Sequence, residues 1–276
     1  MTLDVIKHHR WWFAISSTLV IISLISIFTK GFNFGIDYTG GTIVEVVFDQ
    51  PVEVSQVRDV LKEYNLENAQ IQLSGDTTGD TAGEDVMIRT RNLESSESAA
   101  VVDSLTKSIG NNTVKRIETV GAVIGSEVTE HALLNLVIAF AALALYISYR
   151  FEYKVAISAL VAIFHDLIMV LGVFSYFQLE IDASFLAAIL TVVGYSMNES
   201  VVIFDRVREN MQNMGRKETL DEVVNTSITQ TLSRSVFTSL TTFIMVAALY
   251  VFGVSSVKEF ALPLMAGILC GTYSSV

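Results

Sequence analysis

Long apolar runs separated by short polar stretches make up most of this chain. The first run, Trp11–Phe28, has 18 residues without a charged side chain and follows the basic residues Lys7 and Arg10. The second half of the chain holds five more such runs: Ala132–Ile147, Val155–Phe177, Ala183–Phe204, Val236–Phe252 and Val257–Val276. Because an apolar stretch of about 20 residues crosses a bilayer as a helix, the pattern predicts six transmembrane helices. One lies within residues 1–30 and five within residues 131–276.

The first run has a second interpretation, since a basic start followed by an apolar core is also typical of a cleaved signal peptide. The run is long for a signal peptide, and the residues after it, Lys30, Gly31 and Phe32, offer no small-residue cleavage site. We therefore favour an uncleaved transmembrane helix with Trp11 and Trp12 at the membrane interface.

Residues 31–130 consist of shorter segments whose apolar residues recur with the periods of strands and amphipathic helices. Four segments have the β-branched or alternating composition of strands: Thr42–Phe48, Ala69–Leu73, Asp85–Thr90 and Thr113–Val120. Glu53–Tyr64 and Ser96–Ile109 have the apolar spacing of amphipathic helices, and we expect Ser95 or Ser96 to cap the second helix. Ser74–Gly83 is predicted to be a loop. The order βαββαβ predicts an α+β ferredoxin-like domain between transmembrane helices 1 and 2.

Composition agrees with a membrane protein, because 51% of the residues are hydrophobic and only 17% are charged. Soluble domains carry about 25% charged residues. The net charge of −11 disfavours nucleic acid as a partner, and the single cysteine, Cys270, excludes a disulfide framework. Between Asp37 and Glu130 there are 17 acidic and 7 basic residues. Nearly all of the excess negative charge therefore belongs to the domain over residues 31–130.

Basic residues indicate which loops face the cytoplasm, where Lys and Arg are enriched. They occur in the N-terminus, at Arg150 and Lys154, and through the long loop over residues 205–234. Both termini are therefore predicted to be cytoplasmic and the acidic domain extracytoplasmic. In the long loop, FDRVREN (204–210) followed by LDEVVNTSITQTLSRS (220–235) predicts an amphipathic helix pair, with Leu220, Val223, Val224 and Ile228 on one face. Its apolar face is either part of a solvated surface helix or a docking surface for a partner.

The carboxylate of Glu199 lies inside an apolar run. Glu199 follows Ser196 and Asn198 and precedes Ser200 in the fourth predicted helix. A carboxylate in hydrocarbon costs several kcal/mol unless it is paired, hydrated or protonated. Glu199 is therefore either a site for a proton or an ion, which we favour, or a residue near the interface where the helix ends.

Three further ionisable residues in or beside the spans are candidates: His165, Asp166 and Arg234. His165 and Asp166 interrupt the third helix near its middle. As neighbours on a helix they point about 100° apart, so we expect that they do not simply pair with each other. They are either functional or part of a buried structural hydrogen bond. Arg234 opens the fifth helix, where it is either an interfacial anchor or a countercharge to a carboxylate on the fourth helix.

Several segments resemble motifs of the SecD/SecF protein-export family, a branch of the RND-like superfamily. GIDYTGG at Gly35–Gly41 resembles the signature that follows the family's first span; it contains Gly35, Ile36, Asp37, Gly40 and Gly41. GYSMNESVVIFDRVREN at Gly194–Asn210 resembles the fourth-helix motif of the SecF branch; it contains Asn198, Asp205, Arg206 and Arg208. The last two helices and the pair His165–Asp166 also fit. Similar chains run on past Tyr-Ser-Ser, so we expect the last helix to be incomplete in this sequence.

The resemblance implies a bacterial cytoplasmic membrane protein that pairs with SecD in a 12-helix unit. That unit is expected to use the proton-motive force to assist preproteins leaving the SecYEG channel, with YajC as a further candidate partner. It implies a proton pathway through Glu199 and Arg234, with His165 and Asp166 as further candidates, and a carboxylate supplied by SecD. Protons are the expected coupling ion, without another cofactor. The family usually has Asp where this chain has Glu199, so the acidic group is kept but its carboxyl lies one methylene further from the backbone.

Two other functions remain open at this level. One is half of an RND-type exporter of small molecules or lipids, although a chain with six helices and one outer domain would have to dimerise for that. The other is a structural subunit that stabilises the channel without proton flux. Residues 31–130 carry no pattern of a nucleophile, a metal cluster or a phosphate loop, so we expect a coupling or binding protein rather than an enzyme.

Overall fold

The chain consists of two compact units. The computed structural model describes residues 3–74, 84–215 and 218–276. One unit contains the residues up to Asn33 together with Ala132–Val276, and the other is Phe34–His131. We call them the membrane unit and the inserted unit, because the second interrupts the first along the sequence.

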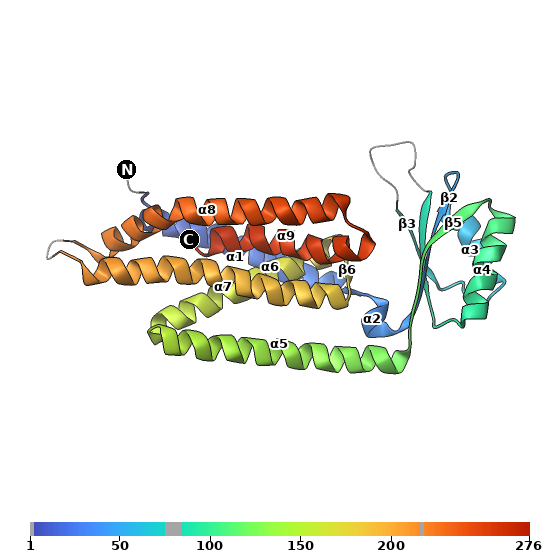
Figure 1. The fold of residues 1–276 in the computed structure, drawn as a ribbon, viewed down its shortest axis with the longest axis horizontal. Helices are drawn as coiled ribbons and strands as arrows, with labels where there is room; N and C mark the ends of the chain where they lie inside the picture. Colours follow the sequence, from blue (N-terminus) through green and yellow to red (C-terminus); the bar gives the residue numbers. More distant parts are fainter. Residues whose placement is uncertain (1–2, 75–83, 216–217) are drawn as a thin grey trace. The chain divides into compact units, whose positions relative to one another are not determined.

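In its described residues the inserted unit has a four-stranded sheet and two longer helices, which Figure 1 labels. Its elements are α2 (Ile36–Thr39), β2 (Gly41–Phe48), α3 (Val54–Lys62), β3 (Gln70–Ser74), β4 (Asp85–Thr90), α4 (Ser95–Ser108) and β5 (Asn112–Val120). From β2 onward this is the predicted order βαββαβ. The strands lie in the order β3-β4-β2-β5, and each neighbouring pair is antiparallel.

The core of the inserted unit lies between the sheet and the helices α3 and α4, which cover the same face of the sheet (Figure 1). Val44, Val46 and Phe48 of β2 alternate with residues of the other face, as the period of a strand requires. From the helices, Leu61 and Leu105 complete the packing and are fully buried. The apolar spacing predicted from the sequence is therefore the spacing of this core.

The starts of the two helices differ from each other. Glu53 caps α3 in a capping box, in which the Glu53 backbone N–H donates to Gln56 Oε1 at 3.0 Å. For α4 the predicted cap at Ser95 or Ser96 is wrong, because the helix already begins at Ser95 and its N-cap is Glu94, without a side-chain hydrogen bond. The predicted loop Ser74–Gly83 lies outside the described residues except for Ser74, which ends β3.

The face of the sheet away from the helices carries an ion-pair network. Glu45 is buried there, and its carboxylate lies 3.2 Å from Arg116 Nε and 3.7 Å from Lys115 Nζ. Lys115 also pairs with Asp85. Partial burial lowers the pKa of Lys115, but its hydrogen bonds and attraction to Asp85 and Glu45 raise that pKa to a net value above the ordinary one. Both bases of β5 thus neutralise part of this unit's acidity.

The membrane unit is helical. Its elements are η1 (Ile6–His8), α1 (His9–Lys30), β1 (Asn33–Phe34), α5 (Ala122–Arg150), α6 (Tyr153–Phe177), β6 (Glu180–Ile181), α7 (Ala183–Gln212), α8 (Leu220–Phe252) and α9 (Ser255–Ser274), with the start of α5 and the end of β1 in the inserted unit. Within the described ranges, five helices are long and apolar enough to cross a membrane: α1 together with η1, α5, α6, α7 and α8.

Both segments of the helix pair predicted in the long loop over residues 205–234 are helical, but they are continuous with the spans instead of forming separate helices. The helix α7 continues to Gln212, and α8 begins at Leu220 behind a capping box formed by Thr219 and Glu222. Only the short connection between Gln212 and Leu220 joins them. Charged residues mark where a helix leaves an apolar environment, but they do not stop its backbone hydrogen bonding, so the two spans simply continue beyond their apolar parts.

The helix α7 packs against α6, α8 and α9, and small residues allow these close contacts. A Cβ on Gly267 of α9 would clash with Val192 of α7, and one on Gly172 of α6 would clash with Ser23 of α1. The close approach at Gly267 thus holds α7, which carries Glu199, against α9.

Candidate functional site: a buried polar cluster among the membrane helices

The polar residues around Glu199 divide between two faces of α7. Ser196, Glu199 and Ser200 are buried, and Glu199 is only 2% exposed. Asn198 is exposed, because one residue step turns the helix by about 100°. The cluster predicted from the sequence is therefore a buried trio, with Asn198 on the opposite side.

Glu199 has no countercharge in the part of the chain that the structure describes. Its Oε2 atom is buried without a hydrogen-bond partner, and so are Ser200 Oγ and Ser235 Oγ. Arg234 is exposed on α8, and no ion pair joins it to Glu199 among the described residues. The structure thus does not bring the two predicted pathway residues together within this chain.

Asp166 lies in a hydrogen-bonded network that includes Ser196 of the trio. Ser196 Oγ donates to Asp166 Oδ2 at 2.6 Å, and Ser274 Oγ donates to the same atom at 2.9 Å. His165 Nδ1 lies 3.0 Å from Asp166 Oδ1, and Tyr273 Oη lies 2.9 Å from His165 Nε2. Asp166 is 1% exposed. The network therefore joins α6, α7 and α9 around one buried carboxylate.

The expectation that His165 and Asp166 do not pair is wrong. Their backbone positions point about 100° apart, but the imidazole ring extends far enough to reach the neighbouring carboxylate at 3.0 Å. In the tautomer with the proton on Nδ1, His165 donates to Asp166 Oδ1 and its Nε2 accepts from Tyr273 Oη. This is the buried hydrogen bond that the sequence left as one of two alternatives.

Replacing Asp166 with Ala is expected to loosen the end of α9. The change leaves Ser196, Ser274 and His165 without their shared acceptor, and each lost partner of a buried polar group costs about 1–3 kcal/mol. The single thiol, Cys270, is buried on α9 one turn before Tyr273. We expect a membrane-permeant maleimide to label it about tenfold faster in Asp166→Ala.

The matched control is Ser26→Ala, which removes the buried hydrogen bond between Ser26 and Ser175, 3.0 Å long, at the contact of α1 and α6. Labelling of Cys270 should be unchanged in this variant. An equal labelling rate in Asp166→Ala and the wild type would contradict the role given to Asp166.

The motif GIDYTGG forms a tight turn in the inserted unit. Gly35 precedes the short helix α2, Ile36 is buried, and Asp37 lies in the first turn of that helix. Gly40 and Gly41 have φ of +69° and +134°, and a Cβ on Gly41 would lie 2.5 Å from the carbonyl oxygen of Thr90. Only glycine fits this backbone, so the two glycines have a structural role between α2 and β4.

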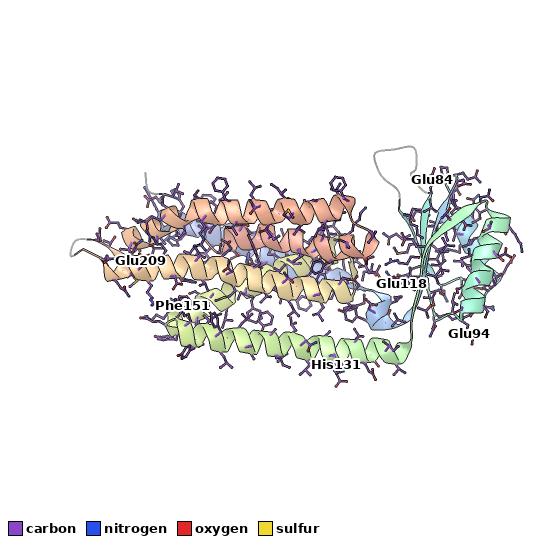
Figure 2. The ribbon with its side chains drawn as sticks, viewed as in Figure 1. Glu84, Glu94, Glu118, His131, Phe151 and Glu209 are labelled. Carbon is purple, nitrogen blue, oxygen red and sulfur yellow. The ribbon has the colours of Figure 1, made fainter. Side chains whose placement is uncertain are left out.

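The other motif residues connect helix ends. Arg150 Nη2 donates to Asp205 Oδ1 at 3.1 Å, and Arg206 Nε donates to Gln230 Oε1 at 2.6 Å. These contacts join the end of α5 and the start of α8 to α7. Arg208 is exposed. Figure 2 shows Phe151, which follows Arg150, and Glu209 near the end of α7, which accepts from Arg206 Nη1 at 2.7 Å.

Sequence reasoning missed three members of the site: Tyr273, Ser274 and Ser235. A signal for Ser235 was present, because α8 repeats small polar residues at every fourth position, through Ser227, Thr231, Ser235 and Ser239, all of which are buried. Such a stripe is typical of helix–helix contacts in membranes. Among the described residues no group of three or more His, Cys, Asp or Glu side chains could hold a metal ion.

The fold and the site define a class: a helical membrane protein whose spans enclose carboxylates and which carries an α+β unit between its first two spans. Residues 100–276 match the family described as "Protein export membrane protein SecD/SecF, C-terminal", and residues 25–52 match the "SecD/SecF GG Motif". The chain therefore belongs to the SecD/SecF protein-export family.

Individual proteins of this family are also similar to the chain. The chain is 40% identical to the protein translocase subunit SecF of Sebaldella termitidis, covering 100% of this chain and 89% of that protein. It is 41% identical to the SecF of Acidaminococcus fermentans, covering 99% and 93%. The crystal structure of SecDF from Thermus thermophilus matches with a TM-score of 0.89 at 34% identity; the match covers all of this chain but only 37% of that one. The function is that of a SecF-type subunit of protein translocase.

Proposed function

We propose that the chain is the proton-exchanging SecF-type half of a unit that assists preprotein translocation through SecYEG, driven by the proton-motive force. The observation that carries this proposal is Glu199, a carboxylate that is 2% exposed and whose Oε2 atom has no partner in the described residues. A carboxylate inside a membrane is costly unless it is paired, hydrated or protonated, and residues of this kind mark proton relays. Glu199 can therefore exchange protons as its surroundings change.

The two states of Glu199 supply a coupling step. Charged Glu199 favours helix packings that bring a cation or water to the carboxylate, whereas neutral Glu199 tolerates the apolar packing of α7 against α8 and α9. Proton binding thus shifts the population of two packings, and we propose that the inserted unit follows. Asp166 and His165 are less suited to exchange, because each already has its hydrogen bonds within the helix group.

A SecD partner fits the exposed charges and surfaces of the spans. Arg234 is exposed on α8, where a charge facing lipid is costly unless it reaches the interface or a partner covers it. Large apolar side chains also line the outer surfaces of α1, α5 and α8. The similar SecDF structure is longer than this chain, which spans 37% of it. We propose that SecD covers Arg234 and supplies a carboxylate to the pathway, and that SecYEG, YajC and the preprotein are further partners.

For the topology we propose six spans in the bacterial cytoplasmic membrane, with α9 as the sixth, both termini in the cytoplasm and the inserted unit outside. Hydrogen bonds from the N-terminal segment to α8 support the location of one terminus: Leu3 N donates to Thr229 Oγ1, and Asn225 Nδ2 donates to Asp4 Oδ1. Both lie at the end of α8 that follows the basic connection. The strand order and antiparallel pairing support a ferredoxin-like fold. We propose no catalytic centre and no cofactor besides the proton.

Inverted membrane vesicles with SecYEG and SecD test this proposal. Export of a preprotein should be faster with the chain than without it, and an ionophore that dissipates the proton-motive force should remove that gain. Tagged chain should also co-purify with SecD. An acceleration that persists at full size in the presence of the ionophore would contradict proton coupling and favour a purely structural subunit.

A further inference from the structure

The inserted unit has an open hollow of about 510 Å³. Its described lining comes from Phe34, the end of α2, the segment between α3 and β3, and the end of β4. All of these residues belong to the inserted unit. Binding sites for small ligands measure about 300–1,000 Å³, so the hollow is large enough to hold one. No residue of the buried polar cluster among the spans takes part in its described lining.

The hollow is basic, although the unit that contains it is acidic. Arg89 and Arg91 line it, and they are two of the seven basic residues between Asp37 and Glu130. None of the 17 acidic residues of that stretch is among its described lining residues. The lining also contains three side-chain amides, those of Asn65, Asn68 and Gln70. This chemistry fits a ligand with negative charge, and the donor fork of Arg matches the oxygens of a phosphate.

Hydrogen bonds orient both guanidinium groups. Arg89 Nη1 donates to the carbonyl oxygen of Phe34 at 3.2 Å and to Gln70 Oε1 at 3.4 Å. Arg91 pairs with Glu97 of α4, which is not among the described lining residues. A guanidinium has five N–H donors, so this pair leaves Arg91 able to donate to a further anion. Because Glu97 offsets one of the two positive charges, the hollow matches a ligand with a single net negative charge.

The hollow lies at the end of the inserted unit where the chain connects to the spans. Phe34 comes four residues after Lys30, the last residue of α1. An extended chain covers at most about 3.5 Å per residue, so Phe34 lies within about 14 Å of the end of that span. The second connection begins beside α2, because a Cβ on Gly125 of α5 would lie 3.0 Å from the carbonyl oxygen of Tyr38. Lipid headgroups extend about 5–8 Å beyond the hydrocarbon, so the chain keeps the hollow near the headgroup layer.

We propose that this hollow binds the headgroup of an anionic phospholipid. The phosphodiester lies at Arg89 and Arg91, and hydroxyl groups of the headgroup bond to the three amides. Phosphatidylglycerol has this chemistry, with a singly charged phosphodiester and a glycerol whose hydroxyl groups are free. The exposed ring of Phe34 supplies an apolar contact beside the charged groups. Binding ties an otherwise acidic unit to the membrane surface, and it does not rest on proton exchange at Glu199.

Hydrogen–deuterium exchange of the full chain in lipid nanodiscs tests this site. In phosphatidylcholine discs that also contain phosphatidylglycerol, the backbone amides of residues 65–70 should exchange about tenfold more slowly than in phosphatidylcholine alone. In Arg89→Gln/Arg91→Gln this protection should be lost, because the charge-assisted hydrogen bonds to the phosphate are removed.

Two further variants complete the test. Asn68→Asp keeps both arginines and the size of the side chain but adds a negative charge to the hollow, so it should also lose the protection. The matched control Lys62→Gln/Lys107→Gln removes two positive charges from surface ion pairs outside the described lining, and it should keep the protection.

Several outcomes would overturn the proposal. Equal exchange of residues 65–70 with and without phosphatidylglycerol excludes the lipid site, and so does protection that persists in Arg89→Gln/Arg91→Gln. If the amides of β2 exchange faster in that variant, its fold is disturbed and the result for Asn68→Asp decides. Inorganic phosphate that protects the wild type equally well in phosphatidylcholine discs identifies a soluble phosphate as the ligand. Protection by an added glutamate-rich peptide identifies a peptide, and either result contradicts the lipid assignment.

Discussion

The variant Glu199→Gln is expected to lose the part of export that depends on the proton-motive force, by about tenfold or more. Gln has nearly the size of Glu and is tolerated at a buried site, but its amide does not take up or release a proton in the physiological pH range. Because Glu199 Oε2 is buried without a partner, the change removes no hydrogen bond of the described structure. The measurement is the ionophore-sensitive export rate in vesicles at equal amounts of the chain.

Two further variants serve as controls for Glu199→Gln. Glu199→Asp keeps an acidic group one methylene shorter and is the residue usual in the family, so it should retain most of the coupled rate. Asn198→Ala, on the exposed face of the same helix turn, leaves the buried side unchanged and controls for a general effect on α7. If ionophore-sensitive export in Glu199→Gln is as fast as in the wild type, Glu199 does not have the proton-exchange role.

Gly41→Ala is expected to destabilise the inserted unit by about 3 kcal/mol. The backbone of Gly41 has φ of +134°, and a Cβ there would lie 2.5 Å from the carbonyl oxygen of Thr90. That oxygen belongs to β4, so relief of the clash requires movement of the central part of the sheet. The effect should appear as faster native-state proteolysis of the inserted unit in the purified chain, which follows the population of opened molecules.

Gly121→Ala is the matched control, since nothing lies within 4 Å of a Cβ at this position. It should change the free energy of unfolding by no more than about 0.5 kcal/mol. Equal protease sensitivity of Gly41→Ala and Gly121→Ala would contradict the structural role of the glycine pair.

The elements of the fold could be predicted where one physical signal dominates. Apolar runs give the spans, and alternation gives strands such as Asp85–Thr90, whose bounds agree with β4. The ends of the helices were harder to predict from the sequence. The helix α7 runs to Gln212 and α5 begins at Ala122, because a helix continues through polar residues once its hydrogen bonding is established. Polarity alone marks the membrane boundary and not the end of the helix.

The site was only partly predictable for a related reason. The sequence singled out Glu199 and Asp166 as costly acids, because charge in an apolar run is a local signal. The partners of Asp166 come from Ser196 and Ser274, which are 30 and 108 residues away along the chain. Their meeting depends on the packing of α6, α7 and α9, which one sequence does not encode in any local pattern. The exposure of Arg234 likewise depends on how the helices pack and could not be predicted from a local pattern.

Proton uptake during export is the most direct test of the central account, in which Glu199 exchanges the coupling proton. Vesicles that contain SecYEG, SecD and the chain are loaded with a pH-sensitive dye, and proton movement is recorded while a preprotein is exported. The wild type should show export-dependent proton movement well above that of vesicles without the chain, and Glu199→Gln should show only that background. Equal proton movement in the wild type and in Glu199→Gln would contradict the account.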